Sequence, residues 1–269
     1  TYAPIMADAR VRKVSLTGST RGGQQMIRDA AQTVKKVSME LGGNAPYILF
    51  DDADLETALD ATVATKFANC GQVCVTPDRF FIHESLHDAF VEGFVKRANA
   101  ITLGDGLDER VTMGPLINSA RLSEIESIVQ DAQRAGATVA TGGKRAANFN
   151  TGHFFEPTVL TGVSDTMKVF AEENFGPIAA ITIFRDDDEV FARANASNMG
   201  LSAYAFTQSS DRARRTVAAL KSGMVGINSF ALAASEAPFG GTNYSGMGRE
   251  GGLEGIEDYL DTKLAQVVF

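Results

Sequence analysis

The sequence has no tryptophan, three histidines and two cysteines among its 269 residues. Cys70 and Cys74 are too few and too close together for the disulfide framework of a small secreted protein, so we expect a reducing compartment, the cytoplasm. Acidic side chains outnumber basic ones by 33 to 25, which gives a net charge of −8. No basic stretch is available for a series of phosphates, and no apolar run approaches the ~20 residues of a membrane span. We therefore expect neither a nucleic-acid partner nor a membrane.

The scarcity of histidine also bears on metal binding. His83 and His87 have the spacing of two ligands on one helix face, but Glu84 and Ser85 between them are typical of a strand exit followed by a helix cap. His153 is isolated in the sequence. We expect no metal site.

The composition that is present, 44% hydrophobic and 22% charged, is typical of a globular protein. Short apolar runs alternate with helical segments, and this order predicts an α/β protein with a largely parallel sheet. Leu55, Leu59, Val63 and Phe67 recur every four residues and predict one buried helix face. The other expected helices cover 22–32, 86–98 and 122–134. The expected strands cover 34–39, 46–50, 80–82, 137–140, 178–184, 203–207 and 224–228.

Three short segments carry groups that are able to do chemistry. Cys74 follows a predicted helix that ends near Gly71, and a thiol in such a turn can be exposed beside backbone N–H groups. Glu40 ends an apolar strand before two glycines, where a desolvated carboxylate can act as a general base. Gly18 and Ser19 lie between a strand and a helix, where N–H groups can meet a phosphate. Taken singly, each is as compatible with a structural role: a buried cysteine, a solvated carboxylate and an ordinary turn.

The order of five motifs is more informative than any one of them. They lie at 17–20 (TGST), 39–43 (MELGG), 67–74 (FANCGQVC), 172–177 (EENFGP) and 238–250 (PFGGTNYSGMGRE). In this order they resemble the aldehyde dehydrogenase superfamily over nearly the whole chain. The resemblance implies an aldehyde dehydrogenase-like catalytic domain with a parallel sheet, preceded by the end of a Rossmann-like cofactor domain.

The resemblance also implies a reaction with NAD or NADP as the cofactor. Cys74 matches the nucleophile, which attacks the aldehyde to give a thiohemiacetal and then a thioester. Glu40 matches the general base for thioester hydrolysis, and branches that use coenzyme A or phosphate as acceptor generally lack it. Cofactor-binding positions match Gly18, Ser19, Gly23, Leu41, Glu173 and Phe175. Substrate-binding positions match Gln72, Asn228 and Phe239.

By the same resemblance, residues 1–42 are the C-terminal part of the NAD(P)-binding domain and residues 43–262 are the catalytic domain with a return segment. Residues 263–269 form an apolar strand expected to pair with another chain, giving a homodimer or homotetramer. Members of the superfamily are usually much longer. We therefore expect this chain by itself to be inactive and to bind cofactor poorly.

The motifs also bear on which aldehyde is the substrate. The motifs are most similar to those of succinate-semialdehyde dehydrogenases, yet Ala68 stands where that branch often has an arginine for the substrate carboxylate. The hydroxyl expected near Ala233 and Ala234 is also missing, and Asn243 replaces a common lysine. Three readings stay open: succinic semialdehyde, an uncharged aliphatic or aromatic aldehyde, and a catalytically retired structural homologue. The joint presence of Cys74, Gln72 and Glu40 argues against the last.

Overall fold

The computed structural model describes residues 2–269, which contain a seven-stranded sheet, a three-stranded sheet and a two-stranded antiparallel pair of β11 and β8. The strands are β1 (Lys13–Thr17), β2 (Lys36–Glu40), β3 (Ala45–Leu49), β4 (Pro77–His83), β5 (Thr138–Thr141), β6 (Thr158–Thr161), β7 (Ile178–Phe184), β8 (Met199–Gly200), β9 (Ser202–Phe206), β10 (Met224–Ile227), β11 (Thr242–Asn243) and β12 (Gly246–Met247). The helices are α1 (Tyr2–Ala7), α2 (Thr20–Ala31), α3 (Leu55–Phe67), η1 (Ala68–Gly71), α4 (His87–Asn99), α5 (Ser119–Arg134), α6 (Lys168–Ala171), α7 (Asp187–Asn195), α8 (Ser210–Ala219) and α9 (Glu254–Glu257).

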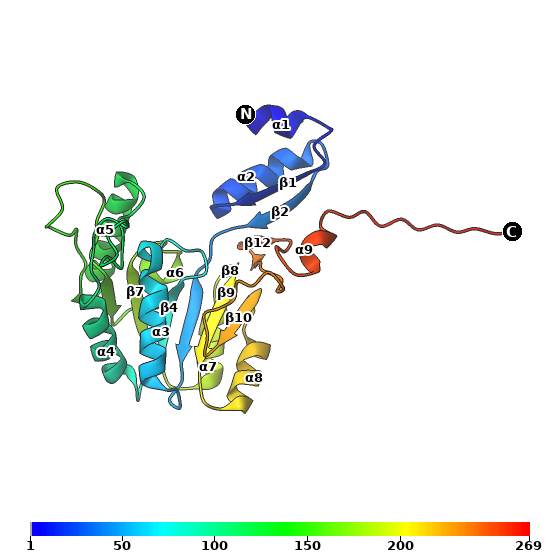
Figure 1. Ribbon diagram of the computed structural model, residues 1–269. Coiled ribbons are helices and arrows are strands. Elements are labelled where there is room, and N and C mark those ends of the chain that lie inside the picture. The colour runs from blue at the N-terminus through cyan, green and yellow to red at the C-terminus, as the bar shows by residue number, and fades with distance from the viewer. Residues whose placement is uncertain (1) are drawn as a thin grey trace.

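The larger sheet has the strand order β10-β9-β3-β4-β7-β6-β5, and only its last pair, β6 and β5, is antiparallel. The smaller sheet has the order β1-β2-β12 and stands above the larger one, with α1 and α2 beside it (Figure 1). We call the two parts the large and small lobes. The predicted α/β fold with a largely parallel sheet is confirmed.

Helices cover both faces of the larger sheet. Successive side chains of a strand point to opposite faces, so a strand that is apolar throughout needs cover on both. In β4, the Phe80 ring packs against Phe94 of α4 with ring centroids 5.8 Å apart. Its neighbour Phe81 packs on the other side, 5.2 Å from Phe170 and beneath the guanidinium of Arg193 in α7. Both phenylalanines are fully buried, so the central strand is sandwiched between two helical layers.

Helix α3 leads to the cysteine segment. Asp54 caps its N-terminus by accepting a hydrogen bond from the Thr57 N–H at 3.2 Å. Of the predicted apolar face, Leu59, Val63 and Phe67 are buried in the core. The helix then ends in the single turn η1, in which Asn69, Cys70 and Gly71 all have positive φ. After this reversal of the chain, Cys74 lies in the turn that precedes β4.

The segment that links the two lobes is buried and is bonded to the C-terminal part of the chain. Residues 41–44 run from β2 to β3 and are buried throughout. Near the other end of the chain β12 returns to pair with β2, with Gly246 opposite Glu40, and the Leu41 N–H donates to the Ser245 carbonyl at 3.0 Å. The predicted boundary between the domains, at residues 41–43, is therefore held by residues 245–247 from the C-terminal part of the chain.

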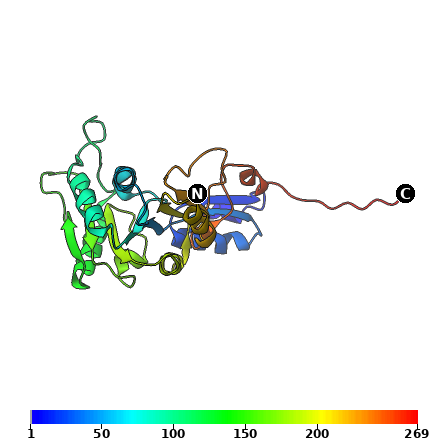
Figure 2. The same ribbon diagram turned by 90° about the horizontal axis from the view of Figure 1, so that it is seen from below.

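Two segments differ from the sequence-based expectation. Val34 was expected to begin a strand, but it has a φ of 52° and is 89% exposed, and β2 begins only at Lys36. Residues 263–269 form no strand; they extend away from the body in both ribbon views (Figures 1 and 2). A strand needs a neighbouring edge, so pairing of this tail with another chain stays a prediction. No helix in residues 2–269 is long and apolar enough to cross a membrane.

Gly71 tests the close packing of the cysteine segment. A Cβ at Gly71 would lie 2.1 Å from the Gly176 carbonyl oxygen, whereas one at Gly162, which has nearly the same φ, would meet nothing within 4 Å. We expect Gly162→Ala to lower the free energy of unfolding by about 1–2 kcal/mol through its backbone conformation alone. Gly71→Ala should lower it by roughly 3–4 kcal/mol, because the collision adds to that cost. Urea denaturation measures both, and equal losses would contradict the predicted collision.

Candidate active site

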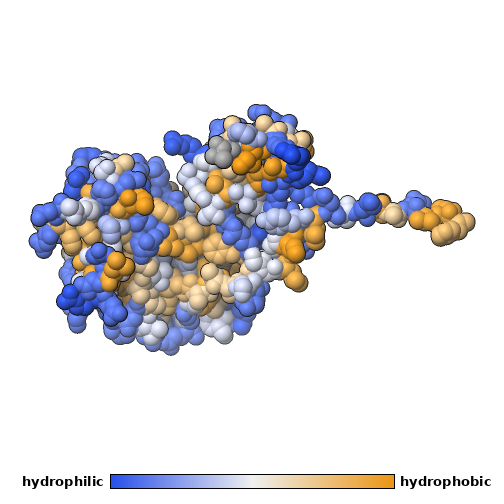
Figure 3. Space-filling view, turned by 45° about the horizontal axis from the view of Figure 1, so that its top comes forward, coloured by the Kyte–Doolittle hydropathy of each residue, from blue (hydrophilic) through white to orange (hydrophobic). Residues whose placement is uncertain are grey.

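A cavity of about 680 Å³ opens where the two lobes meet, and the space-filling view shows the surface hollowed there (Figure 3). It is lined by Thr17, Gly18, Ser19, Glu40, Leu41, Gly42, Gln72, Val73, Cys74, Arg121, Glu173 and Phe175. The cavity thus brings together the predicted site residues except Gly23, Asn228 and Phe239. They come from segments far apart in the sequence because several of these segments precede parallel strands, whose starts meet at one edge of the sheet.

Cys74 presents the more accessible of the two thiols. It is partly buried, whereas Cys70 is fully buried in the core. Burial raises the pKa of the Cys74 thiol, and the nearby carboxylates of Glu173 and Glu40 raise it further. Burial also raises the pKa of Cys70, to about 12. Access to the cavity therefore favours Cys74 as the reactive sulfur.

Glu40 is a buried carboxyl group at the end of β2. Its residue is only 5% exposed, and its Oε2 has no hydrogen-bond partner within residues 2–269. Desolvation raises its pKa to about 7; the charge of Glu250 adds to this, and Arg249 opposes it. A carboxyl group with this pKa exchanges protons near neutrality, which is the property required of a general base.

Glu173 also lines the cavity, and a backbone N–H holds its carboxylate. Its Oε1 accepts a hydrogen bond from the Gly43 N–H at 2.9 Å. A Cβ at Gly42 would lie 2.2 Å from Glu173 Oε2, so the carboxylate occupies space that only glycine leaves free. Burial raises the pKa of Glu173 to about 7.

The start of α2 opens into the same cavity through Gly18 and Ser19. The Ser19 side chain caps the helix by accepting from the Gly22 N–H at 3.2 Å. A Cβ at Gly23 would lie 2.5 Å from Leu41 Cδ2, so this glycine lets Leu41 lie directly against the helix. A helix N-terminus favours a phosphate, and the Glu173 carboxylate can accept hydrogen bonds from sugar hydroxyls. The residues therefore fit the phosphate and ribose groups of a dinucleotide.

The model of the aldehyde dehydrogenase family matches residues 1–265. The chain belongs to this family. It is 48% identical to a non-phosphorylating aspartate-semialdehyde dehydrogenase of Halomonas elongata over 95% of this chain and 52% of that protein. It is 46% identical to an NADP-dependent succinate-semialdehyde dehydrogenase of Escherichia coli over 96% of this chain and 53% of that protein.

The fold matches the crystal structure of succinate-semialdehyde dehydrogenase from Burkholderia pseudomallei with a TM-score of 0.93 and 46% identity. That match covers 96% of this chain and 53% of the other chain. The chain therefore spans about half the length of these aldehyde dehydrogenases.

Two residues that the resemblance to aldehyde dehydrogenases assigns to substrate binding lie outside the cavity. Asn228 follows β10, at the opposite ends of the parallel strands from Cys74, and its amide donates to the Thr207 carbonyl and accepts from the Thr207 N–H. Phe239 is partly buried and exchanges two backbone hydrogen bonds with Glu250. Any substrate contact of either residue stays a prediction.

The sequence motifs missed Arg121, which lines the cavity from the first turn of α5. Its Nη1 forms an ion pair with Glu124 at 2.7 Å, its Nε donates to the Phe175 carbonyl at 3.3 Å, and its Nη2 donates to the Asn174 carbonyl. Asn118 caps α5 by accepting from the Arg121 N–H, so the start of this helix was readable. No local pattern marks that the helix faces the Glu173 loop.

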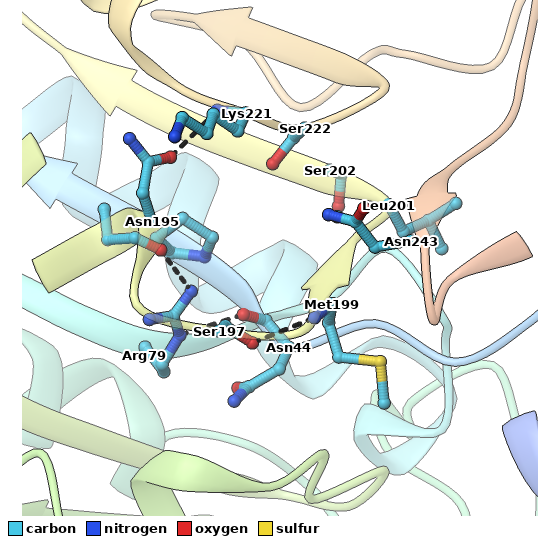
Figure 4. Close-up of a pocket in the computed structure, with 13 residues that line it drawn as sticks. Asn44, Arg79, Asn195, Ser197, Met199, Leu201, Ser202, Lys221, Ser222 and Asn243 are labelled. Carbon is cyan, nitrogen blue, oxygen red and sulfur yellow. Dashed lines mark hydrogen bonds between the residues drawn. The ribbon is translucent and has the colours of Figure 1, made fainter. Parts of the chain in front are cut away.

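A second, much smaller pocket of about 40 Å³ surrounds buried Arg79 (Figure 4). The guanidinium donates to the carbonyls of Asn44, Arg193 and Ala194, the last at 2.8 Å. Two of these carbonyls belong to the last turn of α7, so Arg79 binds a helix C-terminus to β4, the strand that follows Cys74. Its role is structural. No cluster of three metal-binding side chains occurs in the part of the chain that the structure describes.

The proximity of Glu173 to Cys74 is testable through the thiol. An ionised Glu173 raises the pKa of Cys74, so Glu173→Gln should lower that pKa, increase the thiolate fraction and speed alkylation several-fold at about pH 8. Glu172→Gln is the matched control, because its exposed side chain contacts Lys168 instead. Peptide mass spectrometry after timed iodoacetamide treatment measures Cys74. Equal rates in both variants and the native protein would contradict the charge effect.

Proposed function

We propose that the protein containing this chain oxidises an aldehyde to a carboxylic acid with NAD or NADP. The supporting observation is that Cys74, Glu40 and Glu173 line one cavity in a chain of the aldehyde dehydrogenase family. Retention of the thiol, the buried base and the ribose-side carboxylate together speaks against a retired structural homologue.

In the first half of the reaction, the Cys74 thiol loses its proton to solvent water. The thiolate sulfur then attacks the aldehyde carbon, and the carbonyl π electrons move to the oxygen to give the oxyanion of a thiohemiacetal. The developing oxyanion accepts a hydrogen bond from the Cys74 N–H, which lies in the turn before β4. A bound nicotinamide cofactor supplies the hydride acceptor. Loss of hydride from the substrate carbon leaves a thioester on Cys74.

In the second half, Glu40 takes a proton from the water that attacks this thioester. The carbon–sulfur bond breaks, the acid is released and Cys74 is regenerated. Because the pKa of Glu40 lies at about 7, a large share of this carboxyl group is ionised near neutrality while it still holds a removed proton well.

For the cofactor, we assign the phosphates to the start of α2 at Gly18 and Ser19, with Gly23 supporting Leu41. Glu173 would hold the nicotinamide ribose, and Phe175 would pack near the nicotinamide ring. The named relatives are about twice as long as this chain. We therefore propose that the rest of the cofactor site, including the choice between NAD and NADP, lies in a segment outside these residues.

For the substrate, we propose a short aldehyde that carries a carboxylate, such as succinic semialdehyde. The names of both relatives describe semialdehydes of dicarboxylic acids. An uncharged aldehyde is the second candidate, because Ala68 offers no cation and Arg121 is already engaged by Glu124 and two carbonyls.

The exposed C-terminal tail supports a proposal about the oligomeric state. Leu264, Val267, Val268 and Phe269 are all more than half exposed, and they form the apolar end of the tail in Figure 3. An extended apolar segment gains stability by pairing with a sheet edge of another chain. We propose a homodimer or homotetramer, and we keep the cytoplasm as the predicted compartment.

The role of Glu40 separates the two half-reactions. Glu40→Gln in the complete open reading frame should retain a first burst of reduced cofactor but slow steady turnover by roughly 10²–10⁴-fold, because only hydrolysis needs the base. Native turnover should rise as the pH passes through about 7, where Glu40 loses its proton, and the variant should lose this rise. Stopped-flow absorbance of the reduced cofactor measures both phases. Unchanged steady turnover would remove Glu40 from this role.

The substrate is tested with a panel of aldehydes. We expect the complete protein to prefer succinic semialdehyde over uncharged aliphatic and aromatic aldehydes in kcat/KM, with Cys74→Ser as the inactive control. Restoring a cation with Ala68→Arg should then lower the KM for succinic semialdehyde further. A preference for uncharged aldehydes would select the second candidate. It would mean that the absence of a cation at Ala68 reflects a substrate without a carboxylate.

A further inference from the structure

A buried ion pair closes both ends of the segment that carries Cys74. Lys66 lies in the last turn of α3, before the cysteine, and Asp78 lies in β4, after it. Lys66 Nζ and Asp78 Oδ1 are 2.8 Å apart, and the two side chains are 0% and 4% exposed. The reaction scheme above gives neither residue a part. Burial of two charges costs solvation, and an apolar pair of similar volume often stabilises a fold equally well.

The second carboxylate oxygen of Asp78 reaches the cofactor side of the cavity. Oδ2 accepts a hydrogen bond from the Asn174 N–H at 3.0 Å. Asn174 stands between Glu173 and Phe175, is 1% exposed, and its side-chain amide donates to the Val169 carbonyl at 2.8 Å. Its carbonyl accepts from Arg121. The backbone that carries both cofactor-side residues is therefore held at its N–H and at its carbonyl.

Two further features make this loop dependent on its supports. Phe175 has a φ of 42°, in the left-handed region that a side chain disfavours. Such a conformation persists when the surroundings over-determine it. Gly176, the next residue, is packed against Gly71 of the cysteine segment so closely that no Cβ fits between them.

We propose that Lys66 and Asp78 are positioning residues that hold Glu173 and Phe175 in register with Cys74. The proposal rests on the proposed function. Within that function, the ion pair acts on the placement of the cofactor and not on the hydrolysis of the thioester. An aspartate suits this task because each of its two oxygens accepts from a different donor, Lys66 on one side and the Asn174 N–H on the other. An asparagine of the same shape has only one accepting oxygen.

Three variants of the complete protein separate this hydrogen bond from the charge and from stability. In Asp78→Asn, the buried ammonium of Lys66 competes for the single oxygen, so the Asn174 N–H meets an NH2 group. Lys66→Met with Asp78→Asn removes the competing donor and frees that oxygen for Asn174. Lys66→Met with Asp78→Leu has the same net charge and a similar shape but offers no acceptor. The two double variants are therefore matched.

We expect Asp78→Asn and the Met/Leu double variant to raise the cofactor KM roughly tenfold or more, while the KM for the aldehyde stays unchanged. The Met/Asn double variant should return the cofactor KM to within about twofold of the native value, although it carries one more substitution. A rescue of this kind does not follow from a merely structural role. Thermal melting of all three variants records stability separately.

A second readout needs no turnover. Displacement of Glu173 should remove part of its effect on the Cys74 thiol, so alkylation of Cys74 should be faster in the Met/Leu variant than in the charge-matched Met/Asn variant. If the native protein reduced neither cofactor with any aldehyde, the proposed function would fail, and this comparison would still decide the positioning role. Equal alkylation rates in the double variants, or a cofactor KM that follows melting temperature alone, would overturn the proposal.

Discussion

Desolvation of two carboxyl groups beside a thiol is the constraint on which the site depends. Glu40 and Glu173 line the same cavity from different elements, and burial raises the pKa of each to about 7. Water is partly excluded because residues 41–44, which join the lobes, are buried, and because β12 returns to pair with the edge of β2 beside Glu40. A looser contact between the lobes would hydrate both groups and return them to ordinary, permanently ionised carboxylates.

Backbone contact makes this exclusion possible. Gly42 leaves room for the Glu173 carboxylate, and Gly71 lets the cysteine turn touch the backbone at Gly176. The loops before β3, β4 and β7 meet at one edge because these three strands are parallel neighbours. The sheet thus supplies the rough placement of the loops, and the glycines and the Lys66–Asp78 pair set the final distances between them.

Sequence patterns predicted the helices and strands whose formation depends on nearby residues. The four-residue recurrence was sufficient to locate α3, and a short apolar run located β7. The same propensities failed at Val34, where a tight turn imposes a positive φ on a β-branched residue. The motif residues predicted most of the cavity wall. Arg121, Lys66 and Asp78 carry no motif, and their importance arises only from the loops that the fold places beside them.

The acidity of the cavity has a consequence for the nucleophile itself. Burial and two carboxylates all act to raise the pKa of the Cys74 thiol, so the resting sulfur is protonated at neutral pH. A protonated thiol reacts slowly with oxidants and with stray electrophiles, since the thiolate is the reactive form. The same carboxyl groups that catalysis needs therefore protect the cysteine between turnovers. Acylation requires that the thiol first lose its proton, so only the small thiolate fraction present at neutral pH attacks the aldehyde carbon.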